Sequence, residues 1–134
     1  MNFSYEQTTK ILFGRGKIDS IGEIASQYGE NVLLVTEFVN SPLAPLYERV
    51  KGLLQQAGLT VHHYDGVVPN PTTESVDAGT KMARREKVDA VIGIGGGSSM
   101  DTAKAVAMAA INEGRAWDYL FLKSSRKRRC PASP

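Results

Sequence analysis

The residues of this chain best suited to chemistry form a glycine-rich run, Gly93-Ile94-Gly95-Gly96-Gly97-Ser98. The run follows an apolar stretch typical of a buried strand and opens into an alanine-rich helical pattern. A strand that turns through glycines into a helix gathers unpaired backbone N–H groups at the positive helix end, which attracts phosphate. Consecutive glycines also let a ligand approach the main chain without a Cβ in the way. The run therefore predicts a phosphate site, and a tightly packed turn is the alternative.

The spacing of the run departs from two common phosphate-binding patterns. A dinucleotide fingerprint needs Gly-x-Gly-x-x-Gly and an acid about 20 residues later, and a P-loop needs Gly-Lys-Ser/Thr; neither occurs here. Ser98 and Asp101 have the spacing of a capping box, in which each side chain satisfies a donor at the helix start. The local chemistry predicts a diphosphate ligand without specifying which one.

Alternating strand and helix patterns must position this run. Helical patterns cover 18–28, 41–57, 74–85 and 99–112, apolar strand patterns cover 32–36, 60–64 and 88–94, and 3–13 alternates like a hairpin. Ser41 is expected to cap the second helix, with Pro42 in its first turn. Strands and helices that alternate at this spacing predict a parallel sheet. The expected fold class is α/β: a three-layer, Rossmann-like parallel sheet with helices on both faces.

Ligands of such sheets bind at the carboxyl ends of the strands. Besides the glycines, two other strand ends carry suitable residues, Glu37 and the loop around Asn70. Glu37 offers two acceptor oxygens to ribose hydroxyls and would repel a 2′-phosphate, and a solvated surface acid is the alternative. Asn70 lies between two prolines, where turn chemistry alone also explains it.

Two motifs of this chain lie at a set spacing: Pro69-Asn70-Pro71-Thr72 precedes Gly95-Gly96-Gly97-Ser98-x-x-Asp101-x-x-Lys104. With these motifs at this spacing, the chain resembles the iron-dependent alcohol dehydrogenases. The resemblance to the family's N-terminal nucleotide domain runs from about Phe13 to about Phe121. Sugar-phosphate cyclases and glycerol dehydrogenases share a glycine run followed by an acid, and the Pro-Asn-Pro-Thr loop favours the alcohol dehydrogenase branch.

The resemblance implies that residues 1–122 form an NAD-binding α/β domain. It implies cofactor contacts at Glu37, Asn70, Gly96, Gly97, Ser98 and Asp101, with Glu37 where the NAD users of the family usually have aspartate. The family moves hydride between an alcohol or aldehyde and a nicotinamide cofactor, with a divalent metal polarising the oxygen. The metal ligands belong to a helical domain beyond the resemblance. Weak NAD binding is therefore expected here, with no catalytic residue and no iron or zinc site.

Composition narrows the class of protein further. The chain has 134 residues, 42% of them apolar, enough for one globular domain. No apolar run is long enough for a membrane span and no secretory signal pattern occurs. Cys130 is the single cysteine, as expected of a cytoplasmic protein. His62 and His63 are adjacent on a predicted strand, so they point to opposite faces and cannot chelate one ion together.

The pattern breaks at residues 123–134, which we expect to be an irregular basic tail. Five of its residues are Lys or Arg, and without their charges the net charge of +2 becomes −3. Nucleic-acid binding is disfavoured because no aromatic residues alternate with these cations. An out-of-frame reading is one hypothesis for the change of composition. Without the family's following strand, an exposed sheet edge predicts a homo-oligomer, and a non-catalytic self-associating module is the alternative function.

Overall fold

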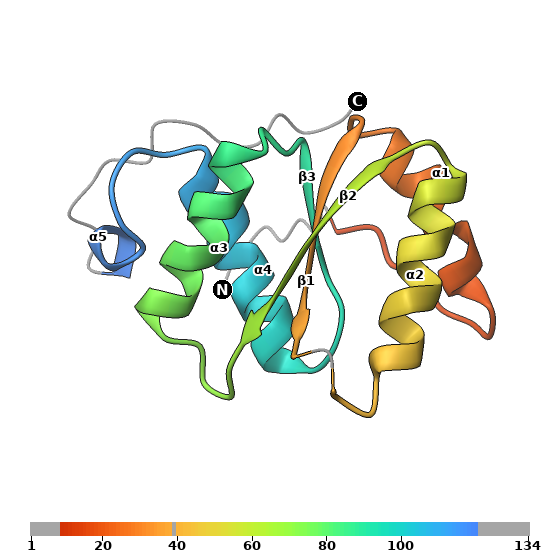
Figure 1. The fold of residues 1–134 in the computed structure, drawn as a ribbon, viewed down its shortest axis with the longest axis horizontal. Helices are drawn as coiled ribbons and strands as arrows, with labels where there is room; N and C mark the ends of the chain where they lie inside the picture. The colour runs from red at the N-terminus through yellow and green to blue at the C-terminus, as the bar shows by residue number, and fades with distance from the viewer. Residues whose placement is uncertain (1–8, 39, 121–134) are drawn as a thin grey trace, which may run out of the picture.

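The strands form one parallel sheet. The computed structural model describes residues 9–38 and 40–120, in which β1 (Asn31–Glu37), β2 (Thr60–Val67) and β3 (Ala90–Gly93) pair in the order β2-β1-β3. All three strands run in one direction, so their carboxyl ends meet at the lower edge in Figure 1.

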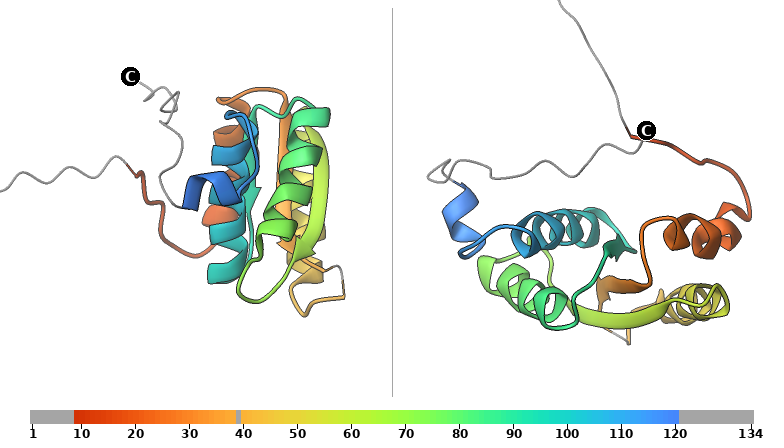
Figure 2. Two further views of the ribbon diagram at one scale, coloured as in Figure 1. Left: turned by 90° about the vertical axis from the view of Figure 1, so that its left-hand side faces the viewer. Right: turned by 90° about the horizontal axis from the view of Figure 1, so that it is seen from above.

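Helices cover both faces of this sheet. Figure 1 shows α1 (Ile21–Ser26) and α2 (Ala44–Gln56) on one side, and α3 (Thr73–Arg85) and α4 (Gly97–Ala110) on the other. The view from above in Figure 2 separates these three layers. The remaining elements are the 3₁₀ turn η1 (Lys17–Ser20) and the short α5 (Trp117–Leu120). The predicted fold class, a three-layer Rossmann-like α/β sheet, is confirmed.

The core is built around β1, whose residues 32–36 are all buried. Val32 and Leu34 pack into the apolar cluster under α1 and α2, whereas Leu33 and Val35 pack into the cluster under α3 and α4. The sequence of a strand covered on both faces is a continuous apolar run, and that of β1 follows this pattern. The alternation places the four apolar side chains of β1, residues 32–35, in one or the other of two cores.

Several predicted element ends differ from the structure. β2 continues to Val67, and α4 begins at Gly97, before Ser99. The predicted Ser41 cap is wrong: α2 begins at Ala44 with Leu43 as N-cap, because the Ser41 carbonyl accepts from Ala44 N–H in a turn that precedes the helix. Residues 9–13 are not a strand, and the rest of the expected hairpin and the basic tail lie outside the described residues. No helix within the described ranges is long and apolar enough to cross a membrane.

A carboxylate fastens the beginning of β1 to the turn before β3. Oδ2 of Asp89 accepts from the backbone N–H groups of Glu30 and Asn31, each at 2.9 Å. The hydrogen bond from Asn31, followed by that from Glu30, lowers the pKa of Asp89. Gly29 lies against this carboxylate with φ 142°, and a Cβ there would stand 2.3 Å from the Asp89 Cβ. The contact therefore needs both the acid and the glycine.

We expect Asp89→Ala to lower the melting temperature at neutral pH and to matter less in acid. A carboxyl whose pKa is depressed by folding contributes stability above its unfolded pKa and loses it as pH falls through the folded pKa. Thermal unfolding of wild type and variant, followed from about pH 7 to about pH 2, should show the gap between them closing. Glu23→Ala, at an exposed acid of α1, is the control. A gap that stays constant with pH would contradict the assignment.

Candidate functional site

Four glycines around the end of β3 have two different roles. A Cβ on Gly93 would stand 2.8 Å from the Ala103 Cβ, and one on Gly95 would stand 2.5 Å from the Ser99 Oγ. Close packing of the strand against α4 requires both glycines, and Gly95 also has φ 140°. At Gly96 and Gly97 a Cβ would meet nothing within 4 Å. These two glycines therefore keep the space before α4 open, as a phosphate site requires.

Helix α4 begins without a side-chain cap. Its N-cap is Gly96, so the predicted capping box of Ser98 and Asp101 is wrong. Ser98 lies within the first turn, where its carbonyl accepts from Thr102 Oγ1 at 2.7 Å. Gly96 offers no side-chain acceptor, so no capping side chain satisfies the first N–H groups of α4. Those N–H groups and the positive helix end suit an anion.

Asp101 faces the loop that follows β2. Its carboxylate is exposed and lies 3.6 Å from Lys104 Nζ. Together with Pro71, Thr72 and Thr73 it lines a mainly apolar hollow of about 260 Å³, completed by Val76, Ala105, Met108, Ala116 and Tyr119. The fold thus brings Asp101 and the Asn70 loop, predicted separately from two motifs, to one hollow beside the start of α4.

The Asn70 loop is held at both ends. Asn70 has φ 54°, the left-handed conformation that asparagine tolerates better than most residues. Thr72 caps α3, its Oγ1 accepting from Ser75 N–H. The Tyr64 hydroxyl donates to the Ser75 carbonyl at 2.6 Å, and burial, with a smaller effect of Asp65, raises the pKa of Tyr64. The phenol therefore stays protonated and ties the end of β2 to the first turn of α3.

Glu37 is the last residue of β1 and is half-buried. Its carboxylate has no hydrogen-bond or ion-pair partner among the residues that the structure describes. The pairing with β2 shifts register between Val35 and Glu37. The carboxylate is therefore available to a ligand at the strand edge.

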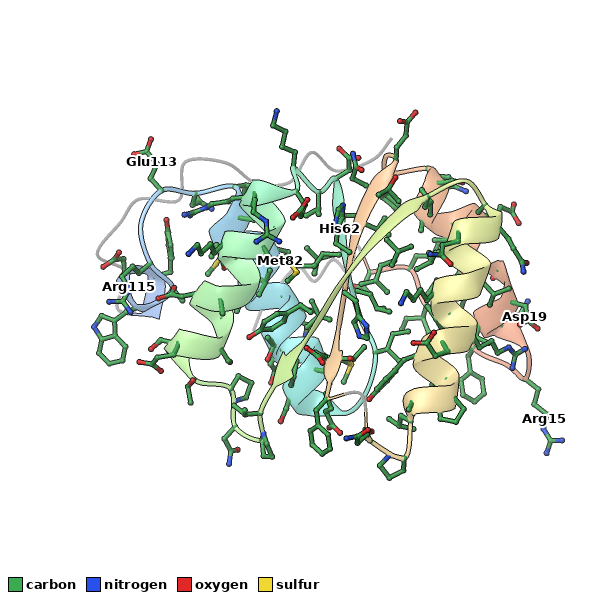
Figure 3. The ribbon with its side chains drawn as sticks, in the orientation of Figure 1. Arg15, Asp19, His62, Met82, Glu113 and Arg115 are labelled. Carbon is green, nitrogen blue, oxygen red and sulfur yellow. The ribbon has the colours of Figure 1, made fainter. Side chains whose placement is uncertain are left out.

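The two histidines lie on opposite faces of β2, as predicted. His62 Nδ1 is 3.7 Å from Glu86 just beyond α3, whereas the His63 ring meets Tyr47 of α2 edge-on. Figure 3 places His62 on the half of β2 remote from the carboxyl edge. Within residues 9–38 and 40–120, no three His, Cys, Asp or Glu side chains gather as a metal site would require. The expectation of no iron or zinc site stays a prediction.

Three residues that position this edge were not predicted as such: Thr36, His63 and Tyr64. Thr36 Oγ1 donates to the Glu37 carbonyl at 2.7 Å and lies 2.8 Å from His63 Nε2. The signal in the sequence was a threonine that ends an apolar strand run. The partners of these side chains depend on strand register and helix packing, which the motifs do not specify.

An open parallel sheet with helices on both faces and a glycine turn at its carboxyl edge is the architecture of a Rossmann-like α/β domain. The family model of the iron-containing alcohol dehydrogenases matches residues 8–134. The chain therefore belongs to the iron-containing alcohol dehydrogenase family. The matched range is wider than the segment 13–121 that carried the resemblance and includes the basic residues 123–134.

Individual relatives agree with this assignment. The chain is 38% identical over 130 residues to the probable NADH-dependent butanol dehydrogenase 1 of Bacillus subtilis, covering 97% of this chain and 34% of that protein. The crystal structure of NADH-dependent butanol dehydrogenase A from Thermotoga maritima superposes with a TM-score of 0.88 at 38% identity, over 97% of this chain and 33% of that one. Sulfoacetaldehyde reductase from Bifidobacterium kashiwanohense, solved in complex with NAD⁺, superposes with a TM-score of 0.75 at 27% identity, over 89% of this chain and 31% of that one. The chain thus spans about a third of the length of these relatives.

We expect Gly95→Ala and Gly96→Ala to differ sharply in stability. Alanine at 95 meets the Ser99 hydroxyl in a strained backbone conformation, whereas alanine at 96 projects into open space. Gly95→Ala should cost more than about 1 kcal/mol of unfolding free energy, and Gly96→Ala less than about 0.5 kcal/mol. Urea denaturation of both variants measures the difference. Equal losses would show that the turn has a different conformation.

Proposed function

We propose that this chain binds NAD at the carboxyl edge of its sheet and supplies the nucleotide-binding part of an alcohol dehydrogenase. The observation that carries the proposal is the uncapped start of α4, where Gly96 and Gly97 leave the approach to the helix N–H groups open. The names of its relatives, NADH-dependent butanol dehydrogenases, and the NAD⁺ complex of a structural neighbour support the same ligand.

Each strand end contributes one part of the proposed site. The N–H groups of residues 96–98 bind the pyrophosphate through charge-assisted hydrogen bonds at the helix start. The Glu37 carboxylate accepts from the ribose hydroxyls. Asp101 lines the hollow, and Asn70 directly precedes Pro71 on its other side; both contact the part of the dinucleotide that reaches it. Residues 1–122 form this binding unit, which we place in the cytoplasm.

Turnover needs more than this edge provides. Hydride transfer to an aldehyde requires a group that polarises the carbonyl oxygen, a role that a divalent metal fills in this family. We propose no catalytic residue among those described, and we expect the 134 residues alone to bind the dinucleotide, weakly, without oxidising alcohols. The relatives' substrates, butanol among them, indicate the class of alcohol for the whole enzyme.

Isothermal titration with NAD and NADP tests this site. NAD should bind more tightly than NADP, because Glu37 places a negative charge where the 2′-phosphate would lie. Gly97→Val should abolish binding, since a branched side chain would occupy the space before α4. Gly52→Val is the matched control, because a Cβ at this helical glycine also meets nothing within 4 Å. Equal or tighter binding of NADP would show that Glu37 does not contact the ribose.

A second candidate function, self-association, is favoured by the outer edge of the sheet. Within the described residues β3 pairs with β1 alone. Beside it lies an apolar hollow of about 270 Å³, lined by Ile21, Ile24, Ala25, Tyr28 and residues 90–92. Tyr28 is 57% exposed. We propose that a second copy of the chain covers this edge, strand against strand, because an open edge with an apolar margin favours pairing.

Light scattering should show a dimer, twice the 14.5 kDa mass of the chain. Tyr28→Lys should shift the protein to monomer, because it places a charge beside the hollow without entering the core. Ile111→Lys is the control, since this exposed residue follows α4 on the other side of the sheet. A wild-type chain that stays monomeric at high concentration would contradict the dimer.

A further inference from the structure

A chain of hydrogen bonds crosses from β2 to the end of β1. His63 Nε2 lies 2.8 Å from Thr36 Oγ1, and Thr36 Oγ1 lies 2.7 Å from the Glu37 carbonyl oxygen. A carbonyl can only accept, so the single hydroxyl proton of Thr36 goes to Glu37. The imidazole must then donate from Nε2 to the threonine oxygen. The chain therefore has one direction, from His63 through Thr36 to Glu37.

These bonds lie where the regular strand pairing changes. Val35 pairs with Tyr64, but Glu37 pairs with Val67, so β2 carries one extra residue at this point. Such a bulge interrupts the ladder and changes the direction of the side chains beside it. Thr36 is fully buried. Its hydroxyl therefore supplies an orienting contact to the Glu37 peptide where the backbone ladder is irregular.

The surroundings of His63 favour its neutral imidazole. Burial is the main reason why the pKa of His63 is lowered, and the charge of Lys51 lowers it further. The carboxylates of Asp65 and Glu48 act in the opposite direction without cancelling this effect. A neutral imidazole has one N–H, and the contact with Thr36 places it on Nε2. The Tyr47 ring stands edge-on to His63 at 6.5 Å, and Tyr47 Oη lies 3.4 Å from Ser41 Oγ in the β1–α2 connection. Tyr47 thus contacts both the donor, His63, and Ser41 in the loop after Glu37.

From this geometry we infer that His63 and Thr36 are positioning residues that set the orientation of Glu37 and so determine the preference for NAD over NADP. The inference rests on the proposed function, because Glu37 must contact the ribose for its orientation to matter. The Glu37 carboxylate has no partner among the described residues, so its direction depends on its own backbone. Loss of either donor frees the Glu37 peptide to rotate, which weakens NAD binding and narrows its advantage over NADP.

Paired variants at each position separate hydrogen bonding from shape. Thr36→Val keeps the volume and removes the hydroxyl, whereas Thr36→Ser keeps the hydroxyl. His63→Leu removes the donor, whereas the amide of His63→Gln can donate from a similar place. Thr80→Val is the control for replacing a buried threonine, because Thr80 is 3% exposed and its hydroxyl has no partner among the described residues.

Dissociation constants for NAD and NADP, with melting temperatures for every variant, are the measurements. Thr36→Val and His63→Leu should each weaken NAD binding by about tenfold, a typical effect of one lost hydrogen bond at a binding site. The dissociation constant for NADP should change much less. Thr36→Ser and His63→Gln should recover most of the wild-type ratio, and Thr80→Val should keep it. In wild type, ¹⁵N NMR should show the Nε2–H tautomer of His63.

Combining Thr36→Val with Glu37→Ala shows whether the chain of hydrogen bonds acts through Glu37. In the Glu37→Ala background, Thr36→Val should have no further effect on the NAD to NADP ratio, because coupled residues are not additive. An unchanged ratio in Thr36→Val, or the same loss with and without Glu37, overturns the inference while NAD binding itself stands. A wild-type chain that binds neither nucleotide overturns the proposed function, and the inference with it.

Discussion

Burial of β1 on both faces is the constraint on which the rest of this structure depends. Residues 32–35 send alternate side chains into two apolar clusters, one under α1 and α2 and one under α3 and α4. A strand buried in this way must be central, so β2 and β3 lie on its two sides. Because every connection returns through a helix, the strands are parallel and their carboxyl ends share one edge. That edge is where the candidate site lies.

At this edge the backbone ladder ends, and each strand end has its own support. Thr36 and His63 hold the end of β1, and the Tyr64 hydroxyl ties the end of β2 to α3. At the end of β3, Ile94 N–H donates to the Val35 carbonyl, and close packing of Gly95 against Ser99 shapes the turn. We propose two groups for the nucleotide: the first N–H groups of α4, which no side chain caps, and the Glu37 carboxylate, which has no partner among the described residues. The strand ends are thus fixed by contacts within the protein, and the polar groups next to them stay available to a ligand.

Much of this arrangement follows from local sequence. The apolar runs and one-faced helical patterns predicted β1, β2 and β3 and the helices α1 to α4, because period 3.6 and continuous burial are properties of short segments. The glycine turn was also predictable, since few residues besides glycine adopt φ 140° under a buried side chain. The caps were not. Ser41 and Ser98 have typical capping residue types, yet a turn before α2 and a glycine N-cap on α4 override them.

The sequence by itself determined the order of elements, the glycine turn before α4 and the membership of the family, because each depends on residues close together in the chain or on motifs at a set spacing. The tertiary structure decided which distant residues meet. Asp101 shares a hollow with Pro71, and His63 reaches Thr36 across the neighbouring strand. Those contacts depend on strand register and on the side of the sheet that each helix covers. Both are set by how the two apolar cores pack around β1, a property of the whole fold that no single segment contains.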